Sequence, residues 1–188
     1  MMEEDLKRAV AILKKGGIIL YPTDTIWGIG CDATNSDAVK KIYSLKKRAE
    51  NKAMLVLVSS MDDVEKYVEK IPDMAFSLND LSEKPVTIIY DNAIGLAPEL
   101  LGNDNSVGIR VSRDVFTQRL CQQLRRPIVS TSANIAGMPS PSFFNEISED
   151  IKNAVDYVVS YRQEDCTPCQ PSSIIKLSTD NVIKIIRP

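Results

Sequence analysis

Residues 16–33 read GGIILYPTDTIWGIGCDA, and this stretch decides the class of fold. The glycine pair ends a preceding segment whose apolar residues recur at helical spacing. Ile18 to Tyr21 then form a short apolar run of the kind found in buried strands, and Pro22 ends that run. Turn-forming and small polar residues dominate from there to Asn35. This order predicts a helix, a buried strand and then a long loop.

Strands and helices alternate along the rest of the chain. Ser36 is placed to cap a second helix, which runs into a basic segment. The alternation predicts an α/β fold whose sheet is mainly parallel and becomes mixed near the C-terminus, where strands follow one another closely. No repeat or shift in composition marks a second domain, so we expect one domain over residues 1–188. Further strands are expected at residues 54–58, 86–90, 106–111, 128–131, 157–160, 173–177 and 181–186.

Composition limits the chemistry that this chain can perform. Its 188 residues are 44% hydrophobic and 26% charged, which is ordinary for a globular protein. The sequence contains no histidine. A Ser-His-Asp or Cys-His nucleophile, a histidine general base and a histidine-containing metal site are therefore excluded. The net charge of −2, from 23 basic and 25 acidic residues, provides no overall basic field for tight nonspecific binding of nucleic acid.

The ends of the chain and its cysteines favour a cytoplasmic protein without a membrane partner. The N-terminal MMEEDLKRAV is acidic and lacks the apolar region of a secretory signal, and the most apolar stretches are too short to cross a bilayer. Cys31 and Cys121 lie far apart in the sequence, and Cys166 and Cys169 form a single C-x-x-C pair. A zinc site would need two further ligands, so we interpret the four cysteines as incidental reduced thiols.

The basic residues that follow the second helix allow two interpretations. Lys46, Lys47, Arg48 and Lys52 lie between this helix and the next strand. Cations at a helix C-terminus are common because they face the negative end of the helix dipole, and a solvated helix end is the simpler interpretation. The alternative is a clamp for a polyphosphate, whose oxygens an arginine grips in pairs.

Glycine-rich nucleotide motifs are weak or missing. Gly28 to Ala33 match the loose dinucleotide pattern G-x-G-x-x-A, but a loop separates them from the preceding strand and no acidic residue follows at the required spacing. The P-loop pattern does not occur.

Two loops rich in hydroxyl groups follow predicted strands. Ser130 to Asn134 lead into a Gly/Pro-rich loop, and Pro22 to Thr25 follow the first strand. These side chains can simply satisfy turns. Ligands in open α/β sheets, however, bind beyond the carboxyl ends of strands. Together with the basic residues, the two loops predict one pocket.

These segments together resemble the threonylcarbamoyl-AMP synthase family, which has the YrdC-like domain. The family's opening pattern, Y-P-T-[DE]-T-x-[YW]-G-[LI]-G-x-D-A, is matched by residues 21–33. Its K-x-R signature is matched by Lys46 and Arg48, and its S-x-N signature by Ser132 and Asn134. The similarity runs in order through the terminal Arg187, and the chain resembles the short single-domain form.

The resemblance implies a twisted open mixed sheet with flanking helices and a concave basic face. It implies synthesis of threonylcarbamoyl-AMP and pyrophosphate from L-threonine, bicarbonate or CO2, and ATP with Mg2+. The implied catalytic residues are Lys46 and Arg48; those for ATP are Arg48, Lys52, Ser106, Ser132, Asn134, Ser140 and Arg187; those for threonine are Thr25, Arg110, Ser130 and Ser172. The sequence does not identify which carboxylates bind the metal, and Asp24 and Asp32 are the candidates.

The implied product serves tRNA modification, so the expected partner is a downstream threonylcarbamoyl-transferase complex. A second hypothesis is a non-catalytic module that binds tRNA or double-stranded RNA on the same face. The low aromatic content of 6% and the negative net charge count against it. A carbamoyl-transfer domain of a hydrogenase-maturation enzyme is disfavoured, because no accompanying acylphosphatase-like or zinc-finger segment is present.

Overall fold

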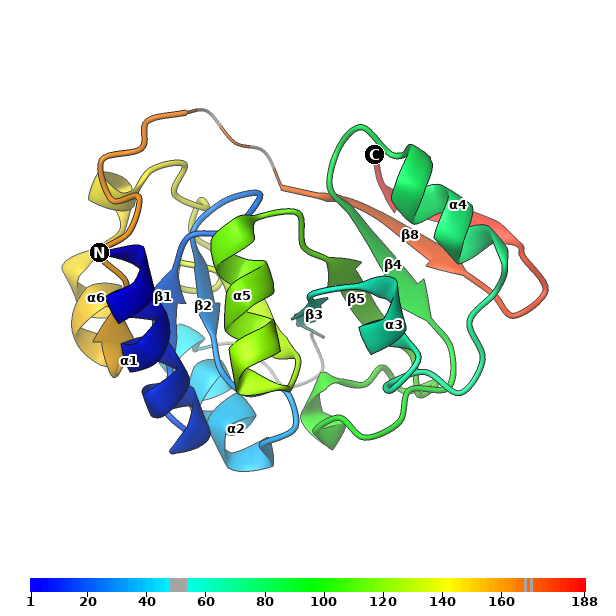
Figure 1. Ribbon diagram of the computed structural model, residues 1–188, viewed down its shortest axis with the longest axis horizontal. Helices are drawn as coiled ribbons and strands as arrows, with labels where there is room; N and C mark the ends of the chain where they lie inside the picture. The colour runs from blue at the N-terminus through cyan, green and yellow to red at the C-terminus, as the bar shows by residue number, and fades with distance from the viewer. Residues whose placement is uncertain (48–53, 168, 170) are drawn as a thin grey trace.

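The computed structural model describes residues 1–47, 54–167, 169 and 171–188. Within these residues, nine strands form one open sheet in the order β7-β1-β2-β6-β3-β5-β4-β8-β9. Figure 1 labels β1, β2, β3, β5, β4 and β8 of this sheet. The predicted mixed sheet with flanking helices is thereby confirmed. The strands are β1 (Ile19–Tyr21), β2 (Gly28–Gly30), β3 (Leu55–Val58), β4 (Val86–Tyr90), β5 (Val107–Val111), β6 (Ile128–Ser132), β7 (Tyr157–Val158), β8 (Ser173–Leu177) and β9 (Ile183–Arg187).

Helices pack on both faces of the sheet. The side chains of a strand point alternately to its two faces, so Ile19 packs with helices α1 and α5, while Leu20 packs with α2. Helices α1 and α5 lie side by side (Figure 1). No helix in the described part of the chain has the length and apolar character needed to span a bilayer. The helices are α1 (Met2–Lys14), α2 (Ser36–Lys46), α3 (Met61–Val64), α4 (Met74–Leu81), α5 (Val115–Leu124) and α6 (Glu149–Ala154), with 3-10 turns η1 (Pro98–Leu100) and η2 (Phe144–Glu146).

The predicted long loop after the first strand contains a strand, so that expectation was wrong. Gly28–Gly30 form β2, which pairs antiparallel with both β1 and β6. A Cβ atom on Gly30 would lie 2.5 Å from the carbonyl oxygen of Val129 and 2.6 Å from a ring carbon of Tyr21. The glycines that suggested a loop instead allow neighbouring groups to approach the backbone closely.

The prediction of a mainly parallel sheet was also wrong. Among the described strands, the parallel pairs β1–β7, β3–β5 and β4–β8 are outnumbered by the antiparallel pairs β1–β2, β2–β6, β3–β6, β4–β5 and β8–β9. The unpredicted β2 supplies two of the antiparallel pairs. The N-cap of α2 differs by one residue: Asn35 accepts the Ala38 N–H, whereas the Ser36 hydroxyl donates to Glu99.

A buried carboxylate fastens the first helix to β7 and the segment that follows it. Asp5 is 3% exposed. Its carboxylate accepts the Tyr157 hydroxyl at 2.5 Å and the backbone N–H groups of Ser160 and Tyr161 at 3.1 and 2.9 Å. Because a buried carboxylate must be satisfied, these three donors fix how α1 docks against that segment.

We expect Asp5→Ala to lower the free energy of unfolding by about 2–4 kcal/mol, because three donors lose a buried, charged acceptor. Urea unfolding measures this loss. Glu4→Ala is the matched control on the same helix, since its ion pair with Arg8 is exposed and contributes little. Equal losses in the two variants would contradict the role assigned to Asp5.

Candidate functional site

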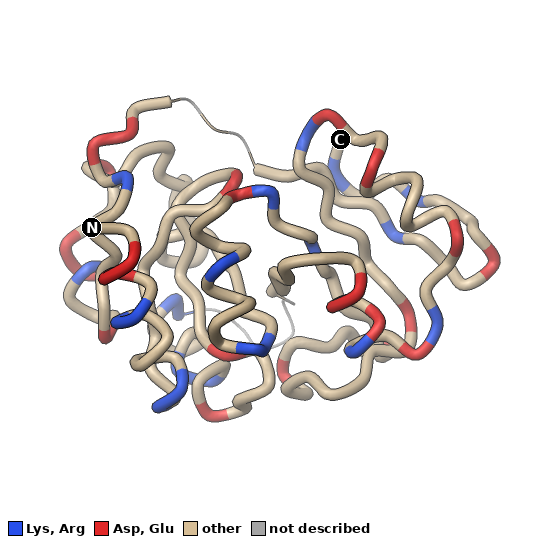
Figure 2. The backbone as a smooth tube through the Cα atoms, in the orientation of Figure 1, with Lys and Arg blue, Asp and Glu red and all other residues tan. Residues whose placement is uncertain are grey.

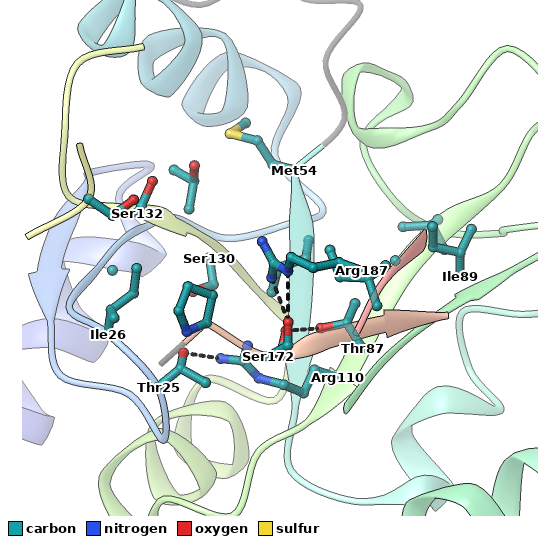
Figure 3. A pocket seen from close by; sticks show the side chains of 18 of the residues that line it. Thr25, Ile26, Met54, Thr87, Ile89, Arg110, Ser130, Ser132, Ser172 and Arg187 are labelled. Atoms are coloured by element: carbon teal, nitrogen blue, oxygen red, sulfur yellow. Dashed lines mark hydrogen bonds between the residues drawn. The ribbon is translucent and has the colours of Figure 1, made fainter. Parts of the chain in front are cut away.

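A cavity of about 310 Å³ opens over the middle of the sheet. Its walls come from the β1–β2 loop, β3, β4, β5, β6, β8 and β9, so segments from the whole chain meet there. Figure 3 shows Thr25 and Ser130 on one side of the cavity and Thr87 and Arg187 on the other. Its described lining contains two arginines and no acidic side chain.

The positive charge of the cavity is local. Figure 2 shows Lys and Arg interspersed with Asp and Glu along the backbone, in keeping with a net charge of −2. Burial is the main cause that lowers the pKa of Arg187, and the positive charge of the nearby Arg110 lowers it further. Two neighbouring guanidinium groups favour an anionic ligand.

Arg110 lies almost completely inside the protein. It is 2% exposed, and its Nη2 donates to the Thr25 hydroxyl at 3.2 Å. The same nitrogen lies 2.9 Å from a carboxylate oxygen of Asp24. β5 therefore supplies a fixed guanidinium beside the hydroxyl of Thr25, as the dashed line in Figure 3 shows. A guanidinium held beside hydroxyl groups suits a ligand carboxylate.

Arg187 acts on the opposite wall by holding the residue before β8. Its Nε and Nη2 donate to the Ser172 carbonyl at 2.9 and 2.7 Å. The hydroxyls of Ser172 and Thr87 are 2.8 Å apart. Thr87 was not predicted from the sequence, although a polar residue within the buried run Val86–Tyr90 is a signal that could have identified it.

The loop before β5 brings Ser106 to the cavity. The Ser106 hydroxyl donates to Asp104 at 2.6 Å, and Lys176 donates to the other oxygen of Asp104 at 2.5 Å. These hydrogen bonds, first from Lys176 and then from Ser106, hold the pKa of Asp104 well below its usual value. The Ser106 proton is committed to Asp104, so its oxygen is left to accept hydrogen bonds.

Lys46 lies inside the protein at the end of α2. It is 1% exposed, and its ammonium donates to the carbonyl oxygens of Ser132 and Asn134 at 2.5 and 2.7 Å and to the Asn134 side chain at 3.3 Å. The Ala136 N–H donates back to the Lys46 carbonyl at 2.9 Å. A phosphate-facing side chain, as the sequence suggested, would be more open than this. The structure shows an ammonium that holds the turn after β6, and a catalytic role for Lys46 stays a prediction.

The structure brings most of the predicted residues together. Asn134 and Lys46 contact each other and are not among the lining residues. Arg48 and Lys52 lie outside the described residues. The predicted residues that line the cavity are Thr25, Ser106, Arg110, Ser130, Ser132, Ser140, Ser172 and Arg187. The other lining residues are mainly apolar side chains or glycines: Ile26, Trp27, Gly28, Met54, Leu55, Ile89, Gly102, Val107, Gly108, Pro171 and Ile174, with Thr87 and Thr131.

Neither carboxylate named as a metal candidate is open to an ion. Asp24 pairs with Arg110, and Asp32 pairs with Arg126 at 2.6 Å and accepts the Thr34 hydroxyl at 2.7 Å. Across the described residues, no three His, Cys, Asp or Glu side chains are grouped as metal ligands. The four cysteines are free thiols.

We expect Lys46→Met to lower the free energy of unfolding by about 2–4 kcal/mol, because three oxygens of the turn lose their charged donor. Lys41→Met is the matched control on α2, since Lys41 is exposed and donates to one carbonyl, that of Gly16, at 3.0 Å. Urea unfolding compares the two variants. A loss for Lys46→Met no larger than that for Lys41→Met would show that the turn does not depend on the buried ammonium.

Comparisons with known proteins agree with this site. The sequence profile of the Sua5, YciO and YrdC proteins, described as telomere recombination, matches residues 11–188. A Methanocaldococcus jannaschii protein with the provisional name threonylcarbamoyl-AMP synthase is 34% identical, over 97% of this chain and 87% of its own. A Photobacterium profundum threonylcarbamoyl-AMP synthase is 31% identical, over 79% of this chain and 82% of its own.

The fold is also similar to a solved structure. The crystal structure of P. abyssi Sua5 complexed with L-threonine superposes with a TM-score of 0.87 at 23% identity, covering 100% of this chain. This chain spans about half of that protein, 54% of its length. The sequence resemblance and the fold class predicted above are both confirmed. Because the profile matches nearly the whole chain, the chain belongs to the Sua5/YciO/YrdC family.

Proposed function

We propose that this protein joins L-threonine, bicarbonate or CO2, and ATP into threonylcarbamoyl-AMP, with release of pyrophosphate. One observation carries the proposal: one wall of the cavity has the buried guanidinium of Arg110 with hydroxyl groups beside it, and another wall has the turn after β6, residues 132–134, called the Ser132 turn below. Relatives named for this synthesis, at 31–34% identity over most of the chain, support it.

Threonine is proposed to bind near Arg110. Its carboxylate suits the guanidinium, and the hydroxyl groups of Thr25, Ser130 and Ser172 suit its polar side chain and amine. The wall is already ordered, because Arg187 and Thr87 hold Ser172 in place. The similar fold of P. abyssi Sua5, which has been solved with L-threonine, supports this assignment.

ATP is proposed to bind along the Ser132 turn and the Ser106 loop. Ser132, Ser140 and Arg187 line this part of the cavity, and apolar residues such as Met54 and Ile89 offer surface to a base. Arg48 and Lys52 follow α2 in the sequence, and Lys46 ties the end of α2 to the Ser132 turn. This connection supports a place for the two cations beside the phosphates.

Mg2+ is proposed to arrive as the complex with ATP. The described residues contain no cluster of three potential metal ligands. Mg2+ keeps several of its waters and binds substrate phosphates, so the ion is proposed to enter with the nucleotide rather than through a set of protein ligands. When bound, the ion neutralises part of the phosphate charge, and arginine side chains neutralise the remaining charge.

The proposed reaction suits a chain without histidine. Bicarbonate takes up a proton and loses water to give CO2. The neutral amine of threonine attacks CO2 and releases a proton to water, which gives a carbamate anion. A carbamate oxygen then attacks the α-phosphorus of ATP, the bond from that phosphorus to the bridging oxygen breaks, and pyrophosphate leaves. Because the nucleophile already carries a negative charge, this step needs positioning and charge neutralisation rather than a strong base.

Several expectations from the sequence stay predictions. These are the cytoplasmic location, the partner complex that consumes the product and direct binding of tRNA or double-stranded RNA. The arginines in the cavity are too few to indicate the long basic track that nucleic acid requires. RNA binding is therefore an outcome of the assay below and not a second proposal.

The direct test is pyrophosphate release with MgATP and bicarbonate, comparing threonine, serine and no amino acid. We expect release to depend on threonine, and serine to react at least about tenfold less efficiently, because it lacks one methyl group. Pyrophosphate release at the same rate with and without threonine contradicts the proposal. RNA affinity that falls steeply with salt, without threonine-dependent release, would favour the RNA-binding module.

We expect Arg48→Ala to lose well over tenfold in turnover, because one contact of this type to developing charge contributes about 3 kcal/mol. The same pyrophosphate assay measures the loss. Lys7→Ala removes an exposed cation on α1 and is the control for net charge. Near-normal turnover of Arg48→Ala would refute the assignment of Arg48 to the phosphate clamp.

A further inference from the structure

Asp24 lies beside the cavity and divides its two oxygens between different tasks. Its side chain is 7% exposed, and Oδ1 lies 2.9 Å from Nη2 of Arg110, whose side chain is 3% exposed. Oδ2 accepts the backbone N–H of Arg113 at 3.2 Å. One oxygen therefore faces the cavity's guanidinium, and the other fastens the β1–β2 loop to the segment after β5.

The pair of Asp24 and Arg110 leaves hydrogen-bonding capacity unused. Among the described residues, Asp24 Oδ1 and Arg110 Nε are buried without a hydrogen-bond partner. The separation of 2.9 Å makes an ion pair, but the N–H of Arg110 is not aligned on Oδ1 as a hydrogen bond requires. Both contacts of the guanidinium, to Asp24 and to Thr25, are made by Nη2.

The charge on Asp24 also has an electrostatic role. Arg110 and Arg187 line the same cavity and repel each other. Burial is the largest cause that lowers the pKa of Arg187, and this repulsion is the second. A guanidinium without a counter-charge here would turn toward any other anion, including the phosphates of a bound nucleotide. Asp24 is the described carboxylate that ion-pairs with Arg110.

We propose that Asp24 is a positioning residue for the amino-acid substrate: its negative charge holds Arg110 so that the unused N–H groups of the guanidinium meet the carboxylate of threonine. This inference rests on the proposed function. Asp24 is not among the residues that line the cavity, so it acts through Arg110.

Asp24→Asn separates the two tasks. An amide oxygen at this position still accepts the Arg113 N–H, so the loop stays fastened, whereas the neutral amide gives Arg110 no counter-charge. Asp24→Glu restores the charge. Arg113→Ala is the matched control, because the contact to Asp24 uses the backbone of Arg113 and not its side chain.

The experiment measures KM for threonine and for ATP, kcat, and the melting temperature of each variant. We expect Asp24→Asn to raise KM for threonine at least about tenfold, with KM for ATP changed less than about twofold and the melting temperature retained. Asp24→Glu should recover most of the loss. Arg113→Ala removes only a hydrogen bond from its side chain to the Asn79 carbonyl, away from Asp24, and should keep both KM values of the parent chain. Stabilisation by threonine alone in a thermal-shift assay should weaken in parallel in Asp24→Asn.

Other outcomes overturn the inference. An unchanged KM for threonine in Asp24→Asn shows that Arg110 needs no counter-charge. Equal increases in both KM values with a lowered melting temperature show a structural role only. If Asp24→Asn does not fold, Asp24→Ser replaces it, because a hydroxyl can also accept the Arg113 N–H, and the same criteria apply. Failure of the parent chain to release threonine-dependent pyrophosphate refutes the proposed function instead.

Discussion

The site depends on one buried ammonium. Lys46 is the last residue of α2, and removing its charge from water is tolerable only because three oxygens of the Ser132–Asn134 turn surround it. This contact joins two segments that are 86 residues apart in the sequence. It fixes the turn after β6, whose Ser132 lines the cavity, against the end of α2. Without it, the turn and the helix end would lose their shared charged contact.

Ion pairs organise the cavity and its border. Arg110 is countered by Asp24, and Asp104 at the border is countered by Lys176 while it orients Ser106. The pair with Asp24 places a buried cation inside a chain whose net charge is −2. These pairs fix the position of one donor, Arg110, and one acceptor, Ser106, at the wall. Groups that are already fixed lose little conformational freedom when a ligand binds.

Local patterns predicted much of this structure. The apolar run Ile18–Tyr21 and the run Val86–Tyr90 both contain the strands that the sequence predicted. The order of the family's motifs located most of the polar side chains that line the cavity, including both arginines. The failures arose from tertiary contacts. Gly30 reads as a turn residue but lies in a strand because Tyr21 and the Val129 carbonyl need its space. The burial of Lys46 depends on a turn far away in the sequence, which no local pattern reports.

Hydrogen–deuterium exchange of the full chain, with and without MgATP, tests most directly whether this cavity receives the nucleotide. We expect ATP to slow exchange of backbone amides at residues 102–108 and 130–140, which belong to the Ser106 loop and the turn held by Lys46. Slower exchange confined to residues 58–67 and 121–127, which border a separate groove, would contradict the assignment of the cavity as the nucleotide site.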